Sequence, residues 1–154
     1  MTRGSGRWAL ALTLAVLVLA ADQLAKWVVL QDWAGLPYRA AGLHLDVAYN
    51  SGISFSQLRD SGSLVLVLVS AVAVGVAIAM VFAAPRYRPA LGVILGGALG
   101  NLLDRLRLDG AVLDFIGIWR YPPFNVADMA IVVGTLWLVA LMLRGARTLS
   151  LIHI

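Results

Sequence analysis

Four apolar segments follow one another along the chain, and each is close to the roughly 20 residues that a helix needs to cross a bilayer. The second segment contains only apolar or small residues. The third is apolar only to Leu103, so it reaches a spanning length if its helix continues to about Leu108. The pattern predicts spans at about residues 8–30, 64–84, 90–108 and 126–143.

Two segments outside these spans carry other patterns. Residues 43–49 alternate apolar and polar side chains, as a half-buried strand does. A turn signal follows at Asn50-Ser51-Gly52, and residues 53–56 alternate again. The two alternating runs indicate a small sheet that rests at the membrane surface. Residues 111–116 form a short apolar run that one aspartate interrupts.

Composition supports a membrane protein. Hydrophobic residues make up 61% of the chain and charged residues only 13%, whereas a soluble domain is about one quarter charged. There is no cysteine, which excludes disulfides and thiolate chemistry, and only His44 and His153 offer imidazole. We therefore expect no metal ion and no other cofactor.

The predicted fold class is an all-α membrane protein with four transmembrane helices. A small extracytoplasmic β-sheet or cradle and a short surface loop or helix complete it, in a single domain of residues 1–154. The net charge of +4 is modest and reports on topology rather than on nucleic-acid affinity. Membrane lipids are expected partners, nucleic acid is not, and a monomer is expected.

Basic residues predict the orientation. They concentrate near the N-terminus, between the second and third spans, and after the fourth, at Arg3, Arg7, Arg86, Arg88, Arg144 and Arg147. Short cytoplasmic loops are enriched in Arg and Lys, so we place these segments and both termini in the cytoplasm. Arginines before an apolar run are also typical of a cleaved signal peptide, but the length of the first run favours an uncleaved helix.

Charged side chains inside the spans need an explanation, because each costs roughly 2.5–3.5 kcal/mol at a helix centre. Asp22 and Lys26 are four residues apart and share a helix face. One interpretation is a self-neutralising pair near the outer interface. The other is a lysine that deprotonates a serine such as Ser54 or Ser56.

A second polar group lies at the end of the third span. Asn101, Asp104 and Arg105 are spaced to share one helix face. They form either a hydrogen-bonded helix end that anchors a loop or the polar wall of a site. Small residues that permit close helix packing precede them, namely Gly92, Gly96, Gly97 and Gly100.

Two further aspartates suggest acid–base chemistry. Asn125 and Asp128 have the spacing of a capping box, and the helix dipole favours the ionised form of Asp128. Asp114 lies between Leu113 and Phe115, and an apolar pocket would raise its pKa. One carboxylate could activate a water while the other protonates a leaving group. Helix capping alone is the competing interpretation.

Five blocks of the chain resemble, in order, those of the bacterial lipoprotein signal peptidase family, also called signal peptidase II. They are residues 22–26 (DQLAK), 50–56 (NSGISFS), 100–105 (GNLLDR), 110–115 (GAVLDF) and 124–128 (FNVAD). The resemblance covers nearly the whole chain. One departure is Ile53-Ser54, where the family commonly has two small residues after the glycine.

The resemblance implies an aspartic endopeptidase of the bacterial cytoplasmic (inner) membrane. Its partners are diacylglyceryl-modified prolipoproteins, which it cleaves just before the lipidated cysteine, near the extracytoplasmic face. The family's catalytic pair, which activates a water, maps to Asp114 and Asp128. Positions that bind substrate map to Asn50, Asn101, Arg105 and Asn125. Structural support maps to Asp22, Lys26, Gly52, Phe55 and Asp104.

Two other classes were weighed against a peptidase. A small transporter or channel would line a path with its intramembrane charges, but it predicts broken helices or an internal repeat, and the sequence shows neither. A membrane scaffold would use its aspartates only to cap helices. Asp114→Asn separates the classes, because a scaffold would keep its function, and Lys26→Ala tests a serine–lysine peptidase.

Overall fold

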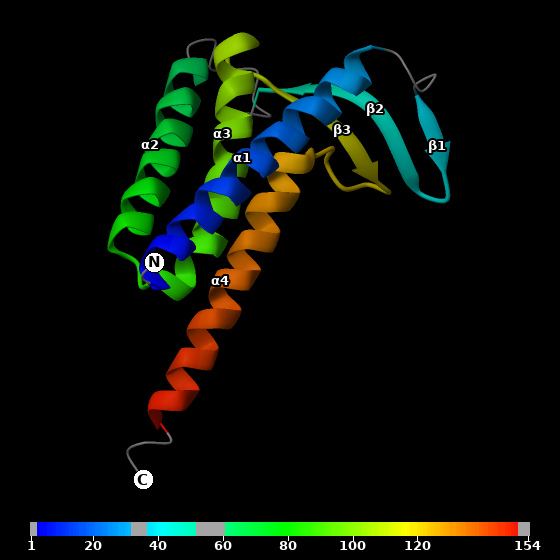
Figure 1. The fold of residues 1–154 in the computed structure, drawn as a ribbon. Coiled ribbons are helices and arrows are strands. Elements are labelled where there is room, and N and C mark those ends of the chain that lie inside the picture. Colours follow the sequence, from blue (N-terminus) through cyan, green and yellow to red (C-terminus); the bar gives the residue numbers. More distant parts are fainter. Residues whose placement is uncertain (1–2, 32–36, 52–60, 151–154) are drawn as a thin grey trace.

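A computed structural model describes residues 3–31, 37–51 and 61–150. Each predicted span corresponds to one long helix, and the strands lie between the helices in sequence (Figure 1). The elements are α1 (Arg3–Leu30), β1 (Tyr38–Ala40), β2 (Leu43–Asn50), α2 (Ser61–Phe82), the 3₁₀ turn η1 (Pro85–Tyr87), α3 (Arg88–Arg107), β3 (Val112–Ile118) and α4 (Val126–Ser150).

Two of the described helices are long and apolar enough to cross a membrane by length and composition. They are Ser5–Leu30 of α1 and Val126–Gly145 of α4. The apolar part of α2, Leu66–Phe82, is shorter. The four-span topology therefore stays a prediction, whereas a mostly helical fold with a small sheet is what the structure has.

Helix α3 is the centre of the bundle and packs against α1, α2 and α4. Small residues allow this close approach, as the sequence predicted. A Cβ atom at Gly92 would collide with the backbone of Ala11 in α1, and one at Gly97 would collide with the backbone oxygen of Ala127 in α4. The three helix axes can approach closely because no side chain separates these backbones.

The sheet has three antiparallel strands in the order β1-β2-β3. The predicted strand at 43–49 is confirmed as β2, the central strand. The apolar run at 111–116, which periodicity left unassigned, lies in β3 from Val112 onward, and Asp114 stands opposite Ala48 in the register. The sheet lies at the end of the bundle opposite the C-terminus (Figure 1). Asp114 therefore sits at this end of the helices.

A surface loop of residues 119–125 carries the chain from β3 into α4. Trp119 adopts a left-handed backbone conformation with φ 52°, and its N–H donates to the carbonyl oxygen of Gly42 over 2.7 Å. Phe124 forms a bridge with Ile116 of β3. These contacts tie the loop to the sheet, so the first residue of α4 is fixed relative to β3.

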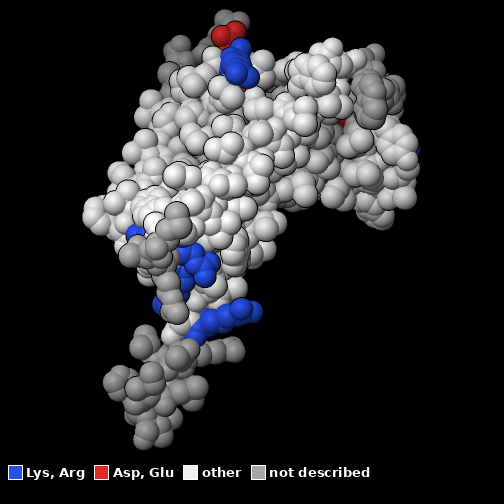
Figure 2. Space-filling view, viewed as in Figure 1, with Lys and Arg blue, Asp and Glu red and all other residues white. Residues whose placement is uncertain are grey.

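The basic segments predicted to share one side meet at one end of the bundle. The Arg88 guanidinium lies 4.5 Å from the ring centroid of Trp8 in α1. The Arg86 side chain reaches Gly145 of α4. Figure 2 shows Lys and Arg side chains toward this end, a further basic patch beside an acidic one at the opposite end, and a largely uncharged surface between them.

Candidate active site

The predicted site residues converge where α3, α4, β2 and β3 meet. Asp114 lies in β3, Asp128 lies in the first turn of α4, and Asn101 lies in the second half of α3. Asn50 ends β2, and Asn125 directly precedes α4. Gly52, Phe55, Ser54 and Ser56 lie outside the described residues.

Asp114 is buried, with 2% of its surface exposed. Its Oδ2 accepts a hydrogen bond of 2.9 Å from the Asn50 amide, and its Oδ1 accepts one of 2.7 Å from the Asn125 amide. Burial raises the pKa of Asp114; the amide hydrogen bonds oppose this effect, and the charge of Asp128 adds to it. This is the direction that the apolar neighbours Leu113 and Phe115 predicted for the pKa of Asp114.

Asp128 forms the predicted capping box. Its backbone N–H donates to Oδ1 of Asn125 over 2.9 Å, and its Oδ2 accepts from the backbone N–H of Asn125 over 3.2 Å. Its other oxygen, Oδ1, accepts from the amide of Asn101 over 2.7 Å. The positive end of the helix dipole lies at this position, so the capping carboxylate sits where the helix favours negative charge.

Asn125 connects the two aspartates. Its fully buried side-chain amide donates to Asp114, as well as to Oδ1 of Asn101 over 3.0 Å and to the carbonyl oxygen of Leu113 over 3.3 Å. The same residue caps the helix that carries Asp128. One side chain thus contacts both Asp114 and the backbone of Asp128 in the first turn of α4, and it holds the two carboxyl-bearing residues in a fixed relation.

Arg105 lies near Asp114 and Asp128 and carries a hydrogen-bond donor with no partner among the described residues. Its Nη1 donates to the backbone oxygen of Asn101 over 3.2 Å. Its buried Nε has no hydrogen-bond partner among the residues that the structure describes. Arg105 and Asn101 line a cavity of about 230 Å³ together with Leu68, Val69, Val72, Ala98 and Ile131. A carbonyl oxygen that entered this cavity would find a cationic donor.

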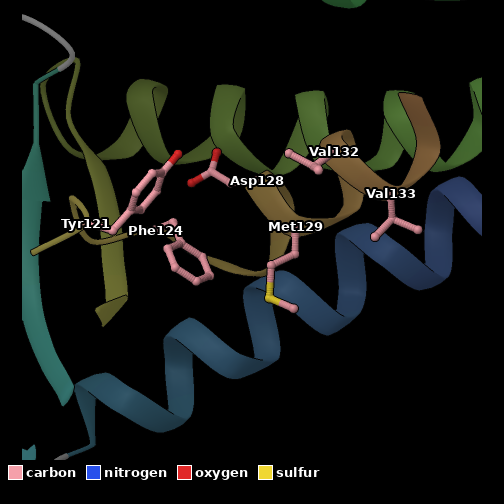
Figure 3. A pocket seen from close by; sticks show the side chains of 6 residues that line it. All are labelled: Tyr121, Phe124, Asp128, Met129, Val132 and Val133. Carbon is pink, nitrogen blue, oxygen red and sulfur yellow. The ribbon is translucent and has the colours of Figure 1, made fainter. Parts of the chain in front are cut away.

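A second cavity, of about 340 Å³, opens beside Asp128 (Figure 3). The rings of Tyr121 and Phe124 meet edge to face at one end of it, with centroids 6.2 Å apart. Met129, Val132 and Val133 of α4 complete the lining. Asp128 is the charged member of this lining, so the cavity offers an apolar ligand a place next to the carboxylate.

The predicted pair of Asp22 and Lys26 is confirmed, with 2.7 Å between Nζ and Oδ2. Sequence reasoning missed the second partner of Lys26, Oδ2 of Asp104, at 2.8 Å. Asn101 and Asp104 share a helix but contact different neighbours, because Asn101 reaches α4 and Asp104 reaches α1. An ammonium held by two carboxylates is not placed to act as a base.

Gln23 is a further site-supporting residue that sequence reasoning did not single out. Its amide donates to Oδ1 of Asp104 over 3.0 Å and to Oδ2 of Asp22 over 3.2 Å. The available signal was an amide next to a charged residue inside an apolar span. Within the described part of the chain, no group of three or more His, Cys, Asp or Glu is placed to hold a metal ion.

Solved structures share this fold. A bacterial membrane enzyme determined at 2.3 Å resolution superimposes with a TM-score of 0.74, at 23% identity, over 88% of each chain. A second, at 1.9 Å resolution, gives a TM-score of 0.76, at 22% identity, over 86% of this chain and 92% of the other. The chain thus has the fold of a bacterial membrane enzyme.

Sequence comparison identifies the family. The family model described as signal peptidase (SPase) II matches residues 14–144. A lipoprotein signal peptidase of Moorella thermoacetica is 40% identical over 136 residues, covering 81% of this chain and 87% of that protein. One of Burkholderia cenocepacia is 35% identical over 155 residues, covering 93% of each. The chain belongs to the signal peptidase II family.

Proposed function

We propose that this chain is an aspartic endopeptidase that removes the signal peptide from diacylglyceryl-modified bacterial prolipoproteins, cleaving just before the lipidated cysteine. Membership of the family supports prolipoprotein processing. The observation that carries the aspartic mechanism is the linkage of Asp114 and Asp128 through Asn125. Water is the nucleophile, and the two aspartates divide the roles of acid and base.

In the proposed reaction, Asp128 accepts a proton from a water whose oxygen adds to the scissile carbonyl carbon. The negative charge that develops on the carbonyl oxygen is stabilised by Arg105. Asp114 then donates its proton to the amide nitrogen of the cysteine as the carbon–nitrogen bond breaks. Transfer of the proton from Asp128 to Asp114 restores the starting state. The raised pKa of Asp114 suits the acid, and the capping position of Asp128 suits the base.

Substrate binding divides among the polar residues and the cavities. Arg105, whose Nε has no partner among the described residues, and Asn101 hold the substrate backbone in the cavity that they line. Asn50 and Asn125 orient the Asp114 carboxyl, and any contact with substrate adds to that role. The cavity beside Asp128 receives apolar groups that flank the scissile bond.

The proposed location is the bacterial cytoplasmic membrane, with four spans and both termini in the cytoplasm. The arginines of the η1 turn and the start of α3 meet the N-terminal part of α1 and the C-terminal part of α4. The site lies with the sheet at the other end. Because positive charge favours the cytoplasmic side, this arrangement supports an active site near the extracytoplasmic face.

A cleavage assay tests the proposal. Purified protein in lipid is given a prolipoprotein with and without diacylglyceryl, and the new N-terminus is identified by mass spectrometry. We expect cleavage before the cysteine of the lipidated substrate only. Asp114→Asn and Asp128→Asn should each lower kcat by about 100- to 10,000-fold, the range for general acid–base catalysis.

Asp46→Asn is the matched control, because it removes a half-exposed carboxylate that is not a residue of the proposed site and whose contact with Arg39 is 3.9 Å long. It should retain full activity. Wild-type activity in either Asp114→Asn or Asp128→Asn would rule out the aspartic mechanism. Equal cleavage of both substrates would rule out recognition of the lipid.

A further inference from the structure

The buried cluster on α1 and α3 is arranged around one cation. The ammonium of Lys26 lies 2.7 Å from Oδ2 of Asp22 and 2.8 Å from Oδ2 of Asp104. All three side chains are buried, with 3%, 0% and 5% of their surfaces exposed. Two carboxylates this far from water require a countercharge, and among the described residues Lys26 is the cation that forms ion pairs with them.

Each carboxylate of the cluster also holds a backbone N–H next to the active site. Oδ1 of Asp22 accepts from the N–H of Ala127 over 2.9 Å. Oδ2 of Asp104 accepts from the N–H of Leu113 over 3.0 Å. Ala127 directly precedes Asp128, and Leu113 directly precedes Asp114. The cluster therefore binds the backbone one residue before Asp114 and one residue before Asp128.

Tight packing leaves these anchors little freedom. A Cβ atom at Gly100 would come within 2.7 Å of Oδ2 of Asp22, so α3 approaches the carboxylate as closely as a glycine permits. The Gln23 amide joins the two carboxylates from a third direction, at 3.2 Å from Asp22 and 3.0 Å from Asp104. Hydrogen bonds to a charged acceptor are roughly twice as strong as neutral ones, so the charge of the carboxylates strengthens both anchors.

We infer that Lys26 is a positioning residue for the peptidase reaction, which sets the placement of β3 relative to α4 by holding the carboxylates that anchor Leu113 and Ala127. The inference rests on the proposed function for the identity of the reaction. Among the described residues, the ion pairs of Lys26 are with Asp22 and Asp104 and not with Asp114 or Asp128. It acts through Asp104 on the strand that carries Asp114 and through Asp22 on the helix that carries Asp128.

Lys26→Met tests this role, because methionine keeps an unbranched side chain and removes the charge. Rates are measured per folded molecule, with folded protein quantified by circular dichroism and size exclusion. We expect kcat to fall by about 100-fold, the scale of a 1 Å misplacement in an active site. KM should stay within about twofold, because binding energy that is realised only in the transition state changes kcat and not KM.

Two readouts separate positioning from a purely structural role. The pH–rate profile should shift in Lys26→Met for two reasons: the charge of Lys26, which lowers the pKa of Asp114, is lost, and the interaction between the two carboxyls changes with their separation. Amide hydrogen exchange at Leu113 and Ala127 should accelerate together by about 10-fold or more, as expected when an opening costs 1.4 kcal/mol less. A structural role would lower the folded fraction and leave kcat and the pH profile of folded molecules unchanged, and this result would overturn the inference.

Arg107→Met is the matched control, since Arg107 is an exposed cation that donates to Oε1 of Gln23 over 3.1 Å but anchors neither amide. Its kcat and both exchange rates should match the wild type. Combining Lys26→Met with Asp104→Asn removes one uncompensated charge and keeps an oxygen for the Leu113 N–H. This double variant should recover about 10-fold of the lost kcat, equivalent to 1.4 kcal/mol.

Failure of the two proposals is distinguishable. If the wild type does not cleave the lipidated substrate, the proposed function falls, and the exchange rates still decide whether Lys26 holds both anchors. If the wild type cleaves and Asp114→Asn does not, but Lys26→Met keeps its kcat, pH profile and amide protection, only the positioning role falls. Faster exchange with unchanged kcat would likewise overturn it.

Discussion

The side-chain amide of Asn125 donates a hydrogen bond of 2.7 Å to Oδ1 of Asp114. Its carbonyl oxygen accepts from the backbone of Asp128. One side chain thus uses its donor on the proposed acid and its acceptor to start the helix that carries the proposed base. The two functions of Asn125 can be separated by mutation.

Asn125→Ser should keep the helix cap and lose the contact with Asp114, because serine is a good N-cap but its side chain is shorter. A hydrogen bond to a neutral carboxyl contributes about 0.5–1.5 kcal/mol, so kcat should fall by roughly 2- to 10-fold. Steady-state cleavage rates and the helical content by circular dichroism measure the two effects. Asn125→Ala should lose the cap as well and unfold at a lower temperature than Asn125→Ser. Equal kcat for Asn125→Ser and the wild type would contradict the link.

The raised pKa of Asp114 predicts a pH-dependent stability. Below the unfolded pKa of about 3.9 both states are protonated. As the pH rises from there through the folded pKa, the unfolded state loses its proton first, so the wild type loses stability. Asp114→Asn cannot titrate. Its thermal midpoint minus that of the wild type should therefore increase over this interval and then level off.

Thermal unfolding in lipid, followed from about pH 3.5 upward, measures this difference. Changes in hydrogen bonding by the new amide do not depend on pH, so they shift the curve without changing its slope. In an Asp128→Asn background, the pH range over which the difference increases should narrow. The reason is that the charge of Asp128, which raises the pKa of Asp114, is gone. A difference that stays constant or decreases with pH would show that burial does not raise the pKa of Asp114.

Arg105→Lys should weaken substrate binding and stabilisation of the reacting carbonyl. Lysine keeps the positive charge but lacks the Nε donor and the planar fork of arginine. Loss of one hydrogen bond to a charged group lowers kcat/KM by roughly 10- to 100-fold. Initial rates over a range of substrate concentrations measure it. Arg107→Lys, two residues along the same helix, should stay within about twofold, since a charge-conserving exposed change has little effect. Similar losses in both variants would argue against a specific role for Arg105.

Met129→Trp should partly fill the cavity beside Asp128. If apolar groups of the substrate bind there, losing burial of about two methylene groups costs about 1.6 kcal/mol and raises KM by roughly 15-fold. Val139→Trp is the control, because Val139 is an exposed residue of the same helix that does not line this cavity. The KM values of both variants, from steady-state cleavage rates, measure the effect. An unchanged KM for Met129→Trp would place the apolar groups elsewhere.

Local patterns were enough to predict part of this architecture. The capping box of Asn125 and Asp128 joins residues three apart, and the Asp22–Lys26 pair joins residues four apart. Such contacts follow from helix geometry once the helix is assigned. The β3 strand was harder, because a short apolar run does not distinguish a strand from a buried helix segment. Its antiparallel pairing with β2 shows that this run is a strand.

By itself, the sequence determined the apolar spans, the helix cap of α4 and the positions of the unusual charges, since each is a property of neighbouring residues. Only the tertiary structure decided which charges meet. Asn50 binds Asp114 across 64 residues, and Asp22 binds the amide of Ala127 across 105. No period or motif encodes these partners. They depend on how closely α1, α3 and α4 pack and on the register of β2 against β3, which every contact in the bundle sets together.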